Sequence, residues 1–176
     1  MNPLLDPIRH NSWASAHLLS FCDGLDEAKL STEEGSEGTY GSIISTLQHL
    51  LGAEARYLRR LSGGSPAWST EPEDTTDLAE LARMSADEAA AWESLLAEEF
   101  DPERLIAWTS AFSGAHTECR AGILVAQTLN HGNEHRAQVF TVLTELGIEP
   151  PDLDGWSYAI ATGRFSEDPP RDQLGT

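Results

Sequence analysis

Apolar side chains recur at helical spacing in four long segments of the chain, separated by polar stretches that contain Gly or Pro. The pattern predicts helices over residues 7–21, 40–61, 77–99 and, starting between 119 and 122, a last helix that runs to 146. Boundary signals agree, because Pro7 follows the candidate N-cap Asp6 and Gly147 follows the last apolar turn. The sequence therefore predicts an all-α protein built on four long helices.

Two connecting segments carry expectations of their own. Residues 105–109 are β-prone and a Ser-Gly pair follows at 113–114, which predicts a small strand or β-hairpin before the last long helix. Residues 62–74 contain several helix breakers and form a long connection. This loop is predicted either to border a functional site or to be a plain surface connection, and the sequence favours neither.

Length and composition predict a single domain. A chain of 176 residues of which 40% are hydrophobic can bury one proper core, whereas two independent cores would be crowded. The helical domain is expected over residues 1–163, and residues 164–176 form a polar, Pro-containing tail. The two cysteines, Cys22 and Cys119, are too few for a disulfide framework.

The net charge of the chain excludes some classes of binding partner. Eleven Lys and Arg residues against 29 Asp and Glu residues give a formal net charge of −18. Nucleic acids and anionic lipid surfaces require a basic footprint, so neither is an expected partner. The first residues show no basic region followed by an apolar run, and no stretch of about 18 apolar residues occurs, which makes the cytoplasm the expected location.

Three histidines carry the strongest chemical signal. His131 and His135 are four residues apart in the last predicted helix, so their side chains share one face. His49 lies in an apolar helical pattern far upstream, on a helix that can face this pair in a bundle. A single buried histidine is usually a hydrogen-bonded core residue, but the pair together with His49 favours a metal site. Three imidazole ligands leave a position of the ion open for chemistry.

Two further residues are predicted to support these ligands. Glu54 falls in the apolar stripe of the second long helix, where an unpaired carboxylate would be costly to bury. It is expected to pair with Arg136 or to orient a metal-bound histidine. The string from His131 to His135 also fits the H-x-x-E-H pattern of inverted zinc proteases, with Glu134 as base. The short remaining chain offers few candidates for the further acidic ligand, so this alternative is disfavoured.

Several strings resemble one metalloprotein superfamily. These are LNHGNEHRAQV at 129–139 with LTELGIEPPDLD at 143–154, NSWA at 11–14, and TLQHLLGAE at 46–54. They are similar to the DinB/YfiT-like superfamily. The resemblance implies a four-helix bundle of that family's topology, a divalent transition metal such as zinc or nickel bound by His49, His131 and His135, and a homodimer.

Three functions follow from this set of residues. The leading hypothesis is a metal-dependent transferase in which the ion binds a low-molecular-weight thiol and activates it towards an electrophilic substrate. Characterised members of the superfamily include such thiol-dependent enzymes. The second hypothesis is a hydrolase that uses a metal-bound water, and the third is a non-catalytic bundle stabilised by its ion.

Overall fold

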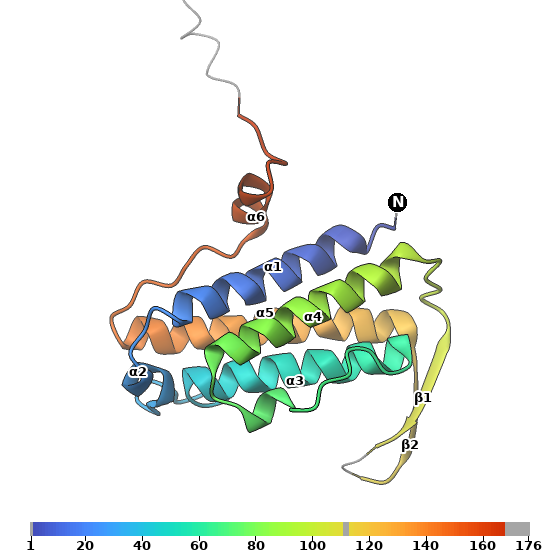
Figure 1. Ribbon diagram of the computed structural model, residues 1–176, viewed down its shortest axis with the longest axis horizontal. Helices are drawn as coiled ribbons and strands as arrows, with labels where there is room; N and C mark the ends of the chain where they lie inside the picture. The colour runs from blue at the N-terminus through green and yellow to red at the C-terminus, as the bar shows by residue number, and fades with distance from the viewer. Residues whose placement is uncertain (1, 111–112, 168–176) are drawn as a thin grey trace, which may run out of the picture.

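A computed structural model describes residues 2–110 and 113–167. Its frame is four long helices that lie side by side: α1 (Leu5–Cys22), α3 (Ile43–Ser62), α4 (Leu78–Ala97) and α5 (Ala121–Glu145) (Figure 1). Helix α3 packs mainly against α5, and α1 packs mainly against α4. The predicted all-α bundle of four long helices is confirmed.

The apolar stripes of the four helices meet in two clusters of buried side chains. One cluster lies around Leu18, Leu47, Met84 and Val142, and the other around Leu58, Trp92 and Val125. Both draw side chains from all four long helices, which is why one continuous bundle forms instead of separate helix pairs. The functional site described below lies where α3 and α5 face each other.

The predicted hairpin is present. Strands β1 (Leu105–Thr109) and β2 (His116–Arg120) pair antiparallel, with Leu105 opposite Arg120 and Thr109 opposite His116. His116 is the first residue of β2. The hairpin is anchored by Ile106, which is buried in the second core cluster.

The second long helix begins later than its apolar pattern predicts. Helix α3 starts at Ile43 and not near residue 40, because the Ser42 side chain accepts a hydrogen bond from the backbone N–H of Ser45 and caps the helix. Gly41, just before this cap, has a φ of 154° that favours glycine. Tyr40 therefore lies on a loop outside the helix.

Three short elements have no counterpart in the sequence prediction. They are α2 (Glu27–Ser31), the 3₁₀ turn η1 (Pro72–Asp74) and α6 (Gly155–Ala161). Helix α6 packs against α1 and stands apart from the rest of the bundle (Figure 1). Its Trp156 and Ile160 side chains are 67% and 63% exposed.

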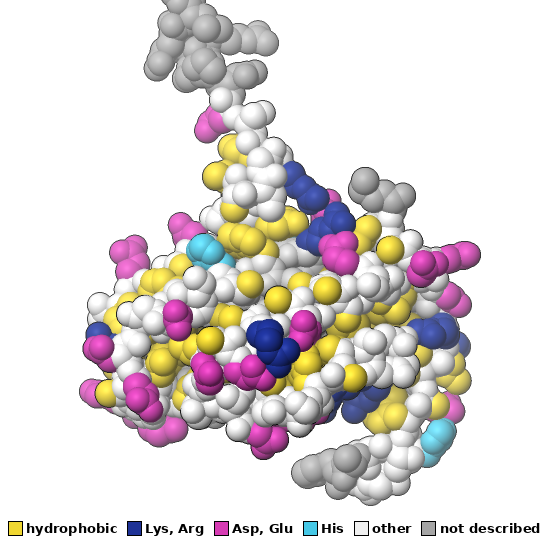
Figure 2. Space-filling view, in the orientation of Figure 1, with side chains coloured by type: hydrophobic (Ala, Val, Ile, Leu, Met, Phe, Trp, Pro, Cys, Tyr) yellow, Lys and Arg dark blue, Asp and Glu magenta, His cyan; other side chains and the backbone are white. Residues whose placement is uncertain are grey.

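Acidic side chains are spread over the visible face of the bundle (Figure 2).

The loop that follows α3 runs back along that helix. We call residues 63–77 the strap. Side chains of α3 hold it at three levels: the Gln48 amide donates to the Thr75 carbonyl, Arg56 pairs with Glu73, and Arg59 binds Glu71 and the Pro66 carbonyl.

Across residues 2–110 and 113–167, no helix is both long and apolar enough to span a bilayer.

Candidate metal centre

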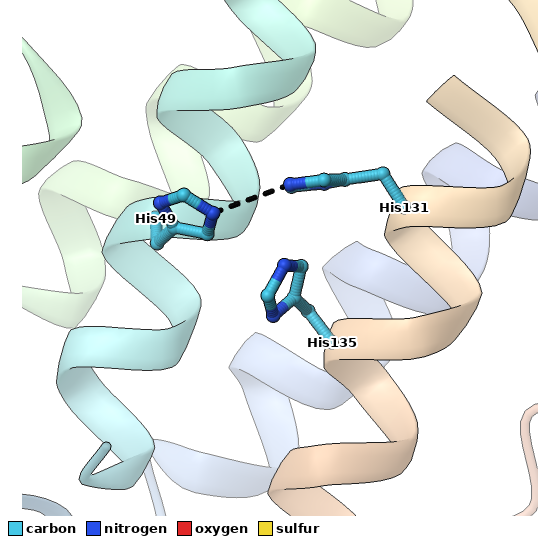
Figure 3. A group of neighbouring side chains, drawn as sticks. All are labelled: His49, His131 and His135. Atoms are coloured by element: carbon cyan, nitrogen blue, oxygen red, sulfur yellow. Dashed lines mark hydrogen bonds between the residues drawn. The ribbon is translucent and has the colours of Figure 1, made fainter. Parts of the chain in front are cut away.

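Three imidazoles converge between α3 and α5. His49 comes from the middle of α3, and His131 and His135 come from successive turns of α5, so that the rings meet in the space between the two helices (Figure 3). His131 and His135 are each 7% exposed, and His49 is half-buried. The i, i+4 spacing on α5 fixes two of the rings on one face, and the close packing of α3 against α5 brings in the third.

The spacing of the ring nitrogens suits one metal ion. The Nε2 atoms of His49 and His131 are 3.3 Å apart, and the candidate ligand atoms of the three histidines all lie within 4.8 Å of one another. Two nitrogens bound to a tetrahedral ion at about 2.0–2.1 Å are themselves about 3.3 Å apart. Two of the three rings are therefore at ligand spacing, and the candidate ligand atom of the third lies within 4.8 Å of theirs.

A glutamine sets the orientation of His135. The Oε1 atom of Gln138 lies 2.8 Å from His135 Nδ1 and also accepts a hydrogen bond from the backbone N–H of Tyr40 at 3.2 Å. Because the amide oxygen can only accept, His135 carries its proton on Nδ1 and keeps the Nε2 lone pair for an ion. Gln138 thereby provides the outer hydrogen bond that metal-bound histidines usually have.

Two tyrosines flank the three rings. Tyr40 stacks on His49, with ring centroids 3.9 Å apart and an angle of 18° between the planes, and it meets His135 edge-on. Tyr57 meets His131 edge-on at 5.8 Å. Tyr40 is 52% exposed, so the outer side of the cluster faces solvent through an aromatic ring. These contacts restrict the rotation of the imidazoles and leave one side of the cluster accessible.

The surroundings lower the pKa of two of the imidazoles. Burial, together with the nearby charges of His135, His49 and Arg56, lowers the pKa of His131 to about 4. Burial, His135 and Arg56 also lower the pKa of His49, against a smaller upward effect of Glu73. A histidine binds a metal through a neutral ring, so these shifts present lone pairs at neutral pH without competition from protons.

Comparison with protein families agrees with this geometry. The family model described as the DinB family matches residues 1–171, which include all four long helices and the three histidines. The chain belongs to the DinB family. No curated protein matches it. In this DinB-family chain, the histidine cluster predicted from spacing is a group that could hold a metal.

Glu54 of α3 and Arg136 of α5 belong to a second buried polar group in this DinB-family bundle. The Asn11 amide donates to both Glu54 carboxylate oxygens at 3.2 Å, and Arg136 donates to Asn11 Oδ1 at 2.9 Å and to Ser15 Oγ at 3.0 Å. Asn11 therefore bridges the two charges. Among the described side chains, neither Glu54 nor Arg136 hydrogen-bonds to the histidine cluster, and the supporting role expected of them there stays a prediction.

A glycine makes room for this Asn11–Glu54–Arg136 network. A Cβ atom at Gly132 would lie 2.5 Å from Asn11 Oδ1 and 2.6 Å from Glu54 Oε1. The residue that follows His131 thus has to be small. Burial raises the pKa of Glu54 to about 7, although Arg136 and Asn11 both lower it. The network is closely packed and almost completely removed from water.

Other sequence candidates lie outside the cluster. Glu134 is exposed on α5. His10 contacts the Leu153 carbonyl, and His17 stacks on Trp13. Gln138 was not among the residues predicted from the sequence, although a hydrogen-bonding side chain three residues after His135 is a usable signal. The stacking of Tyr40 on His49 has no comparable signal in the sequence.

Proposed function

We propose that this DinB-family protein is a metal-dependent transferase that holds zinc or nickel at His49, His131 and His135 and uses a low-molecular-weight thiol as nucleophile. The observation that carries the proposal is the convergence of three imidazoles, whose candidate ligand atoms lie within 4.8 Å of one another beside the half-exposed ring of Tyr40. Three nitrogen ligands are the protein complement of an open zinc site, in which a further position is left for a substrate.

A bound divalent ion lowers the pKa of a coordinating thiol and so makes it a nucleophile at neutral pH. The protein's own groups prepare that position. Gln138 fixes the ring of His135, and the packing of Tyr40 on His49 covers part of the cluster and limits the access of bulk water. The half-exposed edge beside Tyr40 is where a small thiol and an electrophile would enter.

Thiol transfer is favoured over hydrolysis because, among the described residues, the base that the sequence pattern suggests makes no hydrogen bond to the three imidazoles. A hydrolase with a metal-bound water commonly uses a nearby general base. Glu134, the base that the H-x-x-E-H pattern suggests, is exposed on the outer side of α5. A thiol needs no such base, because coordination alone deprotonates it. The residues of this site therefore suit a thiol better than a water.

The proposal is tested with cobalt in place of the native ion. Cobalt(II) bound by three imidazoles has visible absorption bands, and direct sulfur ligation adds an intense band in the near ultraviolet. Titration with 3-mercapto-1-propanol should produce that band in the wild-type protein and not in His135→Ala. A cobalt-loaded wild-type protein whose spectrum responds to no small thiol would overturn the transferase proposal.

A further inference from the structure

An ion pair stands beside the histidine cluster on α3. His49, Gly52 and Arg56 follow one another along one face of this helix, at i, i+3 and i+7. The carboxylate of Glu73, from the strap, occupies the space next to Gly52, where a Cβ atom would overlap it. There it accepts a hydrogen bond from Arg56. The Glu73 carboxylate therefore lies about one helical turn along the axis from His49, and the backbone of Arg56 lies about two turns, or about 10 Å, from it.

The pair is accessible and weakly tied. The Arg56 and Glu73 side chains are 42% and 39% exposed, and among the described residues Arg56 makes this one side-chain hydrogen bond. Arg59 is different: it is 23% exposed and binds both carboxylate oxygens of Glu71 as well as the Pro66 carbonyl. Arg59 is enough to anchor the strap. Arg56 has guanidinium N–H groups to spare, facing the solvent beside the cluster.

Arg56 is a cation on the same face of α3 as His49. The whole chain carries −18, and such a field repels small anions. An anionic substrate group therefore needs a local cation at the site, and a planar guanidinium binds a carboxylate in a two-pronged geometry.

We propose that Arg56 is the specificity-determining residue that binds the carboxylate of an acidic thiol while the sulfur lies at the histidine cluster. Glu73 holds Arg56 in the absence of substrate and is displaced by the incoming carboxylate. This inference rests on the proposed thiol chemistry and adds the substrate class: thiols that carry a carboxylate a few bonds from the sulfur. Neutral thiols of equal length bind more weakly.

Two matched thiols and three variants test the inference. The affinities of 3-mercaptopropionate and 3-mercapto-1-propanol are measured from the cobalt spectrum in the wild-type protein, Arg56→Gln, Glu73→Gln and Arg60→Gln. The last variant is the control, because Arg60 is on the same helix but its guanidinium lies over Trp108, 4.6 Å from the ring centroid. Cobalt content and far-ultraviolet circular dichroism are recorded for each protein.

Arg56→Gln should weaken the affinity for 3-mercaptopropionate by about tenfold or more, which is the effect of losing a hydrogen bond to a charged group. The affinity for 3-mercapto-1-propanol should stay unchanged. Glu73→Gln should raise the affinity for 3-mercaptopropionate, because the competing carboxylate is gone. Arg60→Gln should change neither affinity. If Arg56→Gln binds both thiols as the wild type does, the inference is wrong and the thiol proposal stands. If the cobalt-loaded wild type responds to neither thiol, both are wrong.

Discussion

Two neighbouring sides of α5 bury polar side chains in opposite ways. Towards α3, His131 and His135 meet His49, and three groups of the same kind converge. Towards α1, Arg136 meets Asn11, which also holds Glu54, and a cation, an amide and an anion satisfy one another. His135 and Arg136 are adjacent in the chain and almost equally buried, yet they belong to different clusters.

The difference separates a structural cluster from a candidate binding site. The Asn11–Glu54–Arg136 network has its own counter-charge and donors, so nothing has to be added for it to be stable in the core. Among the described residues, no carboxylate hydrogen-bonds to the histidine cluster. The cluster brings the Nε2 atoms of His49 and His131 to 3.3 Å from each other and leaves His131 Nδ1 buried without a partner among the described residues. A ring lone pair can take up either a proton or a metal ion. The burial that lowers the pKa of His131 disfavours the proton.

The largest effect is expected from breaking the network. Arg136→Leu leaves the Glu54 carboxylate buried without a nearby cation, which should lower the free energy of unfolding by about 3–5 kcal/mol. Urea denaturation above pH 7, where Glu54 is ionised, measures it. Arg83→Leu is the control, since Arg83 is 52% exposed and should change stability by less than about 0.5 kcal/mol. Equal effects of the two changes would show that the network does not stabilise the core.

Filling the space at Gly132 should cost less. The new Cβ of Gly132→Ala forces Asn11 and Glu54 to move, and such overpacking outweighs the helix propensity of alanine to leave a net loss of about 1–2 kcal/mol. Thermal unfolding of the metal-free protein measures the change. Gly155→Ala has open space around its Cβ and serves as the matched control. A neutral Gly132→Ala would contradict the close packing described here.

On the other side of α5, Gln138→Ala should act on the ion and hardly on the fold. Removing the acceptor of His135 Nδ1 is expected to weaken zinc binding by about 10- to 100-fold, as for other outer hydrogen-bond partners. Competition with a chromogenic chelator gives the affinity, and Glu134→Ala, an exposed change on the same helix, is the control. Equal zinc affinity in both variants would remove Gln138 from the site.

A pH series distinguishes the two clusters by the sign of their effect. Glu54 has a folded-state pKa of about 7 against 4.5 in the unfolded chain, so its stabilising contribution is present below pH 4.5 and is lost as pH rises through 7. His131 has a folded-state pKa of about 4 against 6.5, so its contribution is present above pH 6.5 and is lost as pH falls towards 4. Between pH 4.5 and 6.5, the free energy of unfolding therefore falls with pH because of Glu54 and rises with pH because of His131.

Glu54→Gln removes one of these slopes. In the metal-free variant, the free energy of unfolding should rise more steeply with pH than in the wild type between pH 4.5 and 6.5, by up to about 1.4 kcal/mol per pH unit. Urea denaturation at several pH values gives both curves. Parallel curves would mean that Glu54 titrates in the folded protein as it does in the unfolded chain.

The long helices and the three histidines could be predicted because their signals are local and periodic. A stripe of apolar residues repeated over five or six turns indicates a helix, and two histidines at i, i+4 on such a stripe must share a face. Pairing them with His49 requires only that α3 and α5 be neighbours. Short helices such as α2 and α6 have too few turns for a period to be recognised.

Residues placed by loops could not be predicted. Tyr40 reaches His49 because α3 begins only after the N-cap Ser42 and because Gly41 turns the chain just before it. Glu73 reaches Gly52 because the strap folds back along α3. Neither contact follows from spacing, since both depend on how a connection packs. The sequence did place Glu54 in a buried stripe, but its bridge to Arg136 runs through Asn11 on α1, a tertiary contact with no periodic signal.

The central claim is that the histidine cluster holds a metal ion and the Asn11–Glu54–Arg136 network does not. The most direct measurement is the metal content, by mass spectrometry, of tag-free protein, with His135→Ala and Gly132→Ala beside the wild type. The account predicts about one equivalent of a divalent transition metal in the wild type and in folded Gly132→Ala, and its loss in His135→Ala. A wild-type protein that retains no zinc and no nickel even after reconstitution would contradict it.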